Sequence, residues 1–190
     1  MKPLKRISQL LIGGGSLALI ASFFLPIWKI DLWAPQYPEG LSMQIWLNKL
    51  SGQVEIINGL NHYIGMAHIK EEMFPEFGYM PYIVAGVIAF GLLTALSRSR
   101  KVLIAFFVTL VFTAAAALYD FWSWGYQYGH NLADDAAIKV PGMSYQPPLI
   151  GYKELLNFGA YSIPDTGGWL FALLGAIVIG VLFYETKYNK

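Results

Sequence analysis

The sequence contains no cysteine and few charged residues. Only 13% of its 190 residues are charged and 56% are hydrophobic, whereas roughly a quarter of an average soluble domain is charged. Without cysteine, this chain cannot build a disulfide scaffold, an iron–sulfur cluster, a cysteine-ligated zinc site or a thiol nucleophile. The 13 Lys and Arg nearly balance the 12 Asp and Glu, so no net basic field favours nucleic acid as a partner.

Charge is absent from four long apolar stretches, at about residues 8–28, 81–97, 102–119 and 168–184. Each has roughly the 17–25 residues that cross the hydrocarbon core of a bilayer as a helix. Only a helix satisfies all the backbone polar groups of such a segment internally. The predicted fold is therefore one all-α membrane domain, residues 1–190, with four transmembrane helices in two hairpins and a small mixed extracytoplasmic cap.

Basic residues predict the orientation of these helices. They precede the first stretch, fill the short link between the second and third, and follow the fourth: Lys2, Lys5, Arg6, Arg98, Arg100, Lys101, Lys187 and Lys190. Basic segments stay in the cytoplasm. Both termini are therefore expected on the cytoplasmic side of a bacterial inner membrane, and the loops 29–80 and 120–167 on its extracytoplasmic side. A cleaved signal peptide is the alternative for the first stretch, but Phe23, Phe24 and Pro26 make a poor cleavage site.

The four stretches also lack ionisable residues, which argues against a proton-coupled transporter or pump. Any chemistry is then expected in the outer loops. There the sequence shows no Gly-x-Ser-x-Gly elbow, phosphate-binding loop or HExxH motif. We therefore expect a non-catalytic protein.

The outer loops are long enough to carry structure of their own. In the first loop, alternation predicts short strands at 27–33 and 52–57, a turn at Asn58-Gly59, and a helix over 60–74 that Pro75 ends. In the second loop, residues 122–143 are expected to be mostly irregular, and 153–158 to form a short amphipathic helix.

Methionine and histidine are concentrated in these loops. Thioether and imidazole groups suit copper, especially Cu(I), and the candidate ligands are His62, Met66, Met73, His68, His130, Met43 and Met143. A helix over 60–74 would place His62, Met66 and Met73 on one face. His68 would then point away by about 120°, unless Gly65 permits a bend. The alternative is that these methionines fill gaps in a core.

Three short motifs, at residues 34–40 (APQYPEG), 58–66 (NGLNHYIGM) and 147–158 (PPLIGYKELLNF), carry a resemblance to a family. The chain resembles uncharacterised bacterial four-span membrane proteins associated with maturation of nitrous-oxide reductase and other copper enzymes. The resemblance implies an accessory role in copper handling for a respiratory copper enzyme. His62 and Met66 are the motif residues able to bind metal.

Two other functions remain open. Charge-free helices, small residues and aromatic surfaces also suit a structural subunit of a larger respiratory membrane complex. The aromatic clusters suit a protein that binds a quinone or a lipid at the outer interface. Together with Asp134 and Asp135 they would suit an enzyme that acts on such a molecule, although no catalytic constellation is visible. The expected partners are therefore the lipid bilayer and other membrane or periplasmic proteins of a respiratory complex.

Overall fold

Four helices are long and apolar enough to cross a membrane, as the sequence predicts. The computed structural model describes residues 3–188, so Lys2 and Lys190 lie outside the described residues. The first of these helices combines α1 (Arg6–Ala18) with the 3-10 helix η1 (Leu19–Phe23). The others are α3 (Glu76–Ser97), α4 (Arg100–His130) and α5 (Thr166–Tyr188).

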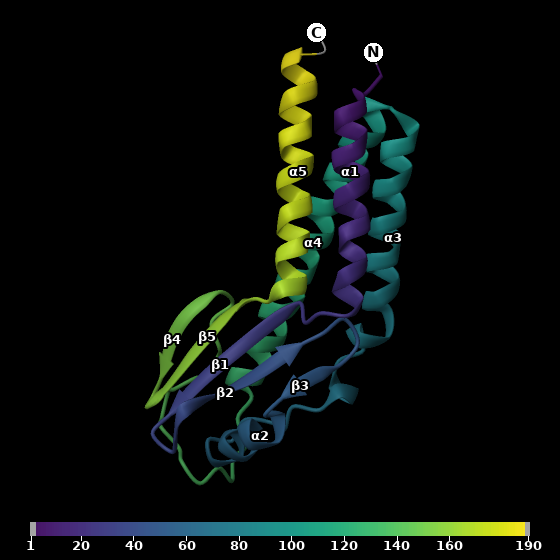
Figure 1. The fold of residues 1–190 in the computed structure, drawn as a ribbon. Coiled ribbons are helices and arrows are strands. Elements are labelled where there is room, and N and C mark those ends of the chain that lie inside the picture. The colour runs from purple at the N-terminus through teal and green to yellow at the C-terminus, as the bar shows by residue number, and fades with distance from the viewer. Residues whose placement is uncertain (1–2, 189–190) are drawn as a thin grey trace.

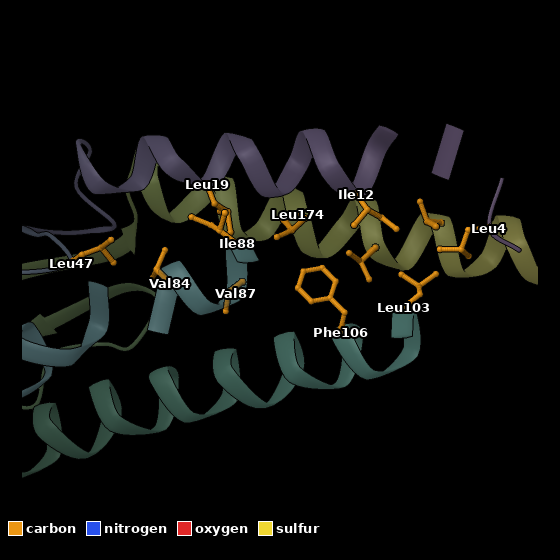
Figure 2. Close-up of a cluster of buried hydrophobic side chains, with 12 residues drawn as sticks. Leu4, Ile12, Leu19, Leu47, Val84, Val87, Ile88, Leu103, Phe106 and Leu174 are labelled. Atoms are coloured by element: carbon orange, nitrogen blue, oxygen red, sulfur yellow. The ribbon is translucent and has the colours of Figure 1, made fainter. Parts of the chain in front are cut away.

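The helices pack side by side as a bundle, with α1 against α3 and α5, and α4 against the same two helices (Figure 1). Side chains from all four meet along its axis. Figure 2 shows Ile12, Leu19, Phe106 and Leu174 directed into the space between the ribbons, and all four are fully buried.

Gly91 sets how closely α1 and α3 approach. A methyl group at this position would lie 2.0 Å from Ser16 Oγ and 2.9 Å from Phe106 Cζ. Gly91→Ala should therefore cost about 1–3 kcal/mol of unfolding free energy. Gly86→Ala on the same helix is the matched control, because nothing lies within 4 Å of its added carbon. Denaturant unfolding in detergent micelles measures both. Equal stability of the two variants would contradict this packing.

The helix ends differ from the predicted spans. The first helix stops at Phe23 because Trp28 begins a strand, whereas α4 continues to His130. Residues 122–130, expected to be irregular, are therefore helical. Trp124 stacks on Tyr128 one turn later, with ring centroids 4.6 Å apart. The hydropathy pattern shows where the apolar run ends, near residue 119. The helix continues beyond this point because its later residues pack against the cap.

Both long loops join a single antiparallel sheet. The first supplies β1 (Trp28–Ala34), β2 (Tyr37–Ile45) and β3 (Leu50–Gly52), and the second supplies β4 (Gly151–Leu155) and β5 (Phe158–Pro164). The strand order is β3-β2-β1-β5-β4, and Ile30 of β1 faces Ser162 of β5. The two loops thus form one cap, and a purely all-α description is too narrow because this cap contains a five-stranded sheet.

Four local predictions for the loops are wrong. The predicted strand 52–57 and the Asn58-Gly59 turn are replaced by α2 (Val54–Tyr63), and the helix expected over 60–74 ends at Tyr63. Burial of Ile57 and Asn58 stabilises α2. This tertiary contact outweighs the weak local preference of residues 52–59 for a strand and a turn. A short 3-10 helix, η2 (Glu71–Met73), follows. The helix expected at 153–158 is instead a hairpin, with Leu156 at φ 59 in its turn.

A second hydrophobic core holds the cap together beneath the sheet. It is formed by buried side chains from the sheet, α2, the segment after α2, the C-terminal part of α4 and the segment between α4 and β4: Ile30, Leu41, Met43, Ile57, Ile64, Met66, Ile69, Tyr128 and Tyr145. Figure 1 shows α2 at the end of the molecule opposite the two termini. Residues carried on α2 and the segment after it therefore lie far from the ends of the bundle that hold the termini.

Candidate metal centre

Four of the predicted ligands line one surface hollow: His62, Met66, His68 and His130. They come from the last turn of α2, the segment after it and the last residue of α4. All three histidines of the chain therefore face the same region, although His130 lies 62 residues beyond His68 in sequence. The histidines are exposed and Met66 is buried. Imidazoles at the surface with a thioether beneath them suit a soft metal.

His62 and His68 are neighbours. Their ring centroids lie 6.1 Å apart, whereas one continuous helix would have turned His68 away. The helix ends at Tyr63 and the chain reverses at Gly65, whose φ is +80. The bend that the sequence permits at Gly65 is therefore present.

Hydrogen bonds fix this reversal. The amide of Met66 donates to the carbonyl of Asn61 at 3.0 Å, and the amide of Ala133 donates to the carbonyl of Gly65 at 2.8 Å. A Cβ at Gly65 would lie 2.9 Å from Ala136 Cβ and 3.0 Å from the Ala133 nitrogen. Glycine is required here both by the positive φ and by the close approach of the second loop.

Two buried side chains hold the segment that carries Met66 and His68. Asn58 Nδ2 donates to the Ile69 carbonyl at 3.0 Å, and its Oδ1 accepts from the Ile69 amide at 2.7 Å. The Tyr128 hydroxyl donates to the Ala67 carbonyl and accepts from Asn61 Nδ2. The backbone on both sides of His68 is thereby tied to α2 and α4, which limits the freedom of the imidazole.

His130 is oriented by its own helix. Its Nδ1 lies 2.8 Å from the Tyr126 carbonyl, and its ring stacks on Tyr126 with centroids 4.0 Å apart. Because a carbonyl only accepts, Nδ1 is the donor in this contact, and Nε2 is the ring nitrogen that is left to bind a metal. Backbone partners of this kind commonly fix the tautomer of a metal-binding histidine.

The three other predicted ligands lie elsewhere. Met43, only 4% exposed, and Met73 line a cavity between the sheet and the bundle. Met143 is half-buried and packs against the core of the cap. The seven candidates therefore do not meet at one point. Met43 and Met143 fill space as core methionines commonly do, whereas the Met73 side chain is exposed.

The geometry of the hollow favours a low coordination number. Within residues 3–188, no three His, Asp or Glu side chains are grouped closely enough to hold a metal, so His130 does not complete a three-histidine site as placed. Two imidazoles that each bind a metal at about 2.0 Å keep their centroids roughly 5–6 Å apart, close to the 6.1 Å between His62 and His68. Two imidazoles and one thioether suit Cu(I), whereas structural zinc requires four ligands.

Comparison of the chain with protein-family models, curated proteins and solved structures finds no match. The resemblance to four-span proteins associated with copper enzymes therefore stays a prediction. Any function has to be inferred from the contacts of the hollow itself.

Proposed function

We propose that this chain is a non-catalytic membrane accessory protein that binds Cu(I) outside the membrane and supports a respiratory copper enzyme. His62, His68 and Met66 are the proposed ligands, and His130 is a neighbouring imidazole through which the ion enters or leaves. One observation carries the proposal. The bend at Gly65 and the end of α4 bring all three histidines and Met66 to a single hollow.

Exposed apolar side chains support insertion into a bilayer. The outer faces of the four long helices carry large hydrophobic residues with little cover from the rest of the protein, among them Leu10, Leu96, Phe112 and Phe183. Phe112, for example, is 75% exposed. In water such a surface would drive aggregation, whereas lipid solvates it.

The placement of basic residues supports the proposed orientation. Lys5, Arg6, Arg98, Arg100 and Lys187 lie at helix ends on the side of the termini (Figure 1). The hollow is built on α2 and the last residue of α4, at the opposite end. If basic segments stay in the cytoplasm, the proposed copper site faces the oxidising compartment, where methionine and histidine replace cysteine as stable Cu(I) ligands.

Competition for Cu(I) tests the proposal directly. The full chain in detergent is titrated anaerobically against the chromogenic chelator bicinchoninate. We expect wild type to take up about one equivalent of Cu(I), and the His62→Ala/His68→Ala variant to bind at least about 100-fold more weakly. Met66→Leu should weaken binding while preserving the packing volume.

Two matched controls accompany the titration. Met73→Leu and Met143→Leu remove thioethers that lie away from the hollow, and both should bind Cu(I) as wild type does. Failure of wild type to bind copper, or equal binding by the double histidine variant, would overturn the proposal. Stable co-purification of a copper-free protein with larger respiratory subunits would favour the structural role instead.

A further inference from the structure

A second cavity, of about 400 Å³, lies between the sheet and the bundle. Its walls come from the sheet and its connections, from η2, from the start of α3 and from the C-terminal half of α4. The volume falls within the range of about 300–1,000 Å³ that is typical of small-molecule sites. In the proposed orientation, with the cap outside the membrane, this junction lies at the outer surface of the bilayer, where an amphipathic molecule can enter from lipid.

Aromatic rings form much of the wall: Trp28, Trp46, Phe74, Phe77, Phe121 and Trp124. Several of them hold one another in place. Trp28 meets Phe121 edge-on at 5.3 Å, and Trp124 lies 4.7 Å from Phe74 between ring centroids. Mutual packing of this kind gives rigid, flat walls that suit a planar ring.

Two of the tryptophans have no free donor for a ligand. Trp28 Nε1 donates to Ser162 Oγ at 2.8 Å, and Trp46 Nε1 donates to Ser51 Oγ at 2.7 Å. With these indole N–H groups satisfied, the two tryptophans contribute apolar ring surface. The chemical character of the ligand is then decided by the few polar groups in the wall.

Two carboxylates supply the charge of the cavity. Glu76, the first residue of α3, and Asp120 of α4 both line it, and they are close enough for their charges to repel. Among the described residues that line it, none is Lys, Arg or His. The neutral side chains of Ser123 and Gln127 also line it. Because ionised carboxylates only accept hydrogen bonds, a polar group that binds against Glu76 and Asp120 must donate hydrogen bonds and carry no negative charge.

We propose that this cavity binds an isoprenoid quinol, with the ring between the aromatic walls and its hydroxyl groups donating to Glu76 and Asp120. A quinol combines a planar ring, two hydroxyl donors and an apolar tail that continues into the bilayer. The oxidised quinone has only carbonyl acceptors, so it gains no hydrogen bond from either carboxylate. The cavity therefore prefers the reduced form. Quinol binding here does not depend on copper binding at the hollow.

Quenching of tryptophan fluorescence by decylubiquinol tests the site. The full chain is placed in phosphatidylcholine nanodiscs, and quenching by the quinol is compared with quenching by decylubiquinone. Wild type should show saturable quenching with about a tenfold preference for the quinol. Glu76→Gln/Asp120→Asn should lose that preference, because the new amides donate to quinone carbonyls as readily as they accept from quinol hydroxyls.

Further variants separate the site from general effects. Ala117→Trp places a large side chain in the cavity wall from an exposed position of α4, and should abolish saturable quenching by both forms. Glu72→Gln and Asp135→Asn remove exposed carboxylates outside the cavity, and should keep the wild-type preference. His62→Ala/His68→Ala should also bind the quinol normally, so failure of this site and failure of the copper site are distinguishable.

Three outcomes would overturn the inference. The first is quenching that does not saturate in wild type. The second is equal affinity for quinol and quinone in wild type. The third is displacement of the quinol by phosphatidylethanolamine in the nanodisc at ordinary membrane fractions, which would identify a zwitterionic lipid as the occupant.

Discussion

Glu185→Ala is expected to lower the free energy of unfolding by about 3 kcal/mol or more, because it removes a buried acceptor that serves at least two donors. Glu185 is fully buried near the end of α5. It accepts a hydrogen bond from the Lys5 amide at 2.9 Å and another from the Ser8 hydroxyl. Ser8 lies in the first turn of α1, and Lys5 is the residue that precedes the helix. The Lys5 side chain makes no capping hydrogen bond to this helix.

The carboxylate therefore caps α1 from another helix. A carboxylate near a helix N-terminus satisfies an orphan amide and interacts favourably with the helix dipole. This contact also ties the first and last helices of the chain together at the end of the bundle that carries the termini (Figure 1). Its loss should leave the Lys5 amide and the Ser8 hydroxyl unsatisfied in an apolar setting.

Denaturant unfolding followed by circular dichroism measures the effect. Glu185→Gln retains one acceptor oxygen and should lose less stability than Glu185→Ala. Glu72→Ala, at an exposed position on η2, should leave stability within about 0.5 kcal/mol of wild type. A Glu185→Ala variant as stable as Glu72→Ala would show that this contact does not hold the bundle together.

Gly65→Ala is expected to weaken Cu(I) binding at least about tenfold, although Gly65 supplies no ligand atom. Its φ of +80 is strained for alanine, and the added carbon would meet Ala136 and the Ala133 backbone. Either the bend opens or the second loop moves away. The first change separates His62 from His68, and the second removes the hydrogen bond from the Ala133 amide that holds the Gly65 carbonyl in place.

Gly59→Ala is the matched control for this prediction. Gly59 lies on α2, and nothing is within 4 Å of its added carbon. Alanine should also favour the helix there, so Cu(I) affinity should match wild type in the same chelator competition. Wild-type affinity in Gly65→Ala would mean that the bend does not position the ligands.

The sequence predicts the four long helices because their signal is local. Each is a continuous apolar run, so composition alone finds it, and the structure contains four such helices. Their ends are less predictable. The polar and aromatic residues 121–130 continue α4 because they pack beneath the sheet, where Tyr128 is buried. A hydropathy pattern contains no information about that contact.

The cap depends on contacts distant in sequence. Pairing of β1 with β5 joins Ile30 to Ser162, and no pattern within either loop specifies that partner. The short strand at 27–33 is confirmed apart from a shift at its ends, because its alternation is local. The Asn58-Gly59 turn is wrong because Asn58 instead bonds the Ile69 backbone, which buries it within a helix.

The candidate centre is predictable in composition but not in arrangement. The concentration of histidine and methionine in the loops indicates His62, Met66, His68 and His130, which line one hollow. The same signal also selects Met43, Met73 and Met143, which lie elsewhere. The junction cavity is not predicted because its walls come from several separate elements. The sequence feature that could have indicated this cavity is a pair of carboxylates, Glu76 and Asp120, beside aromatic residues at the ends of apolar runs.

X-ray absorption at the copper edge tests the central claim most directly. The full chain is loaded with about one equivalent of Cu(I), and its spectrum is compared with that of Met66→Leu. We predict two nitrogen ligands from imidazoles at about 2.0 Å and one sulfur ligand at about 2.3 Å, with the sulfur lost in the variant. A protein that retains no copper, or copper bound without sulfur in wild type, would contradict the proposed site.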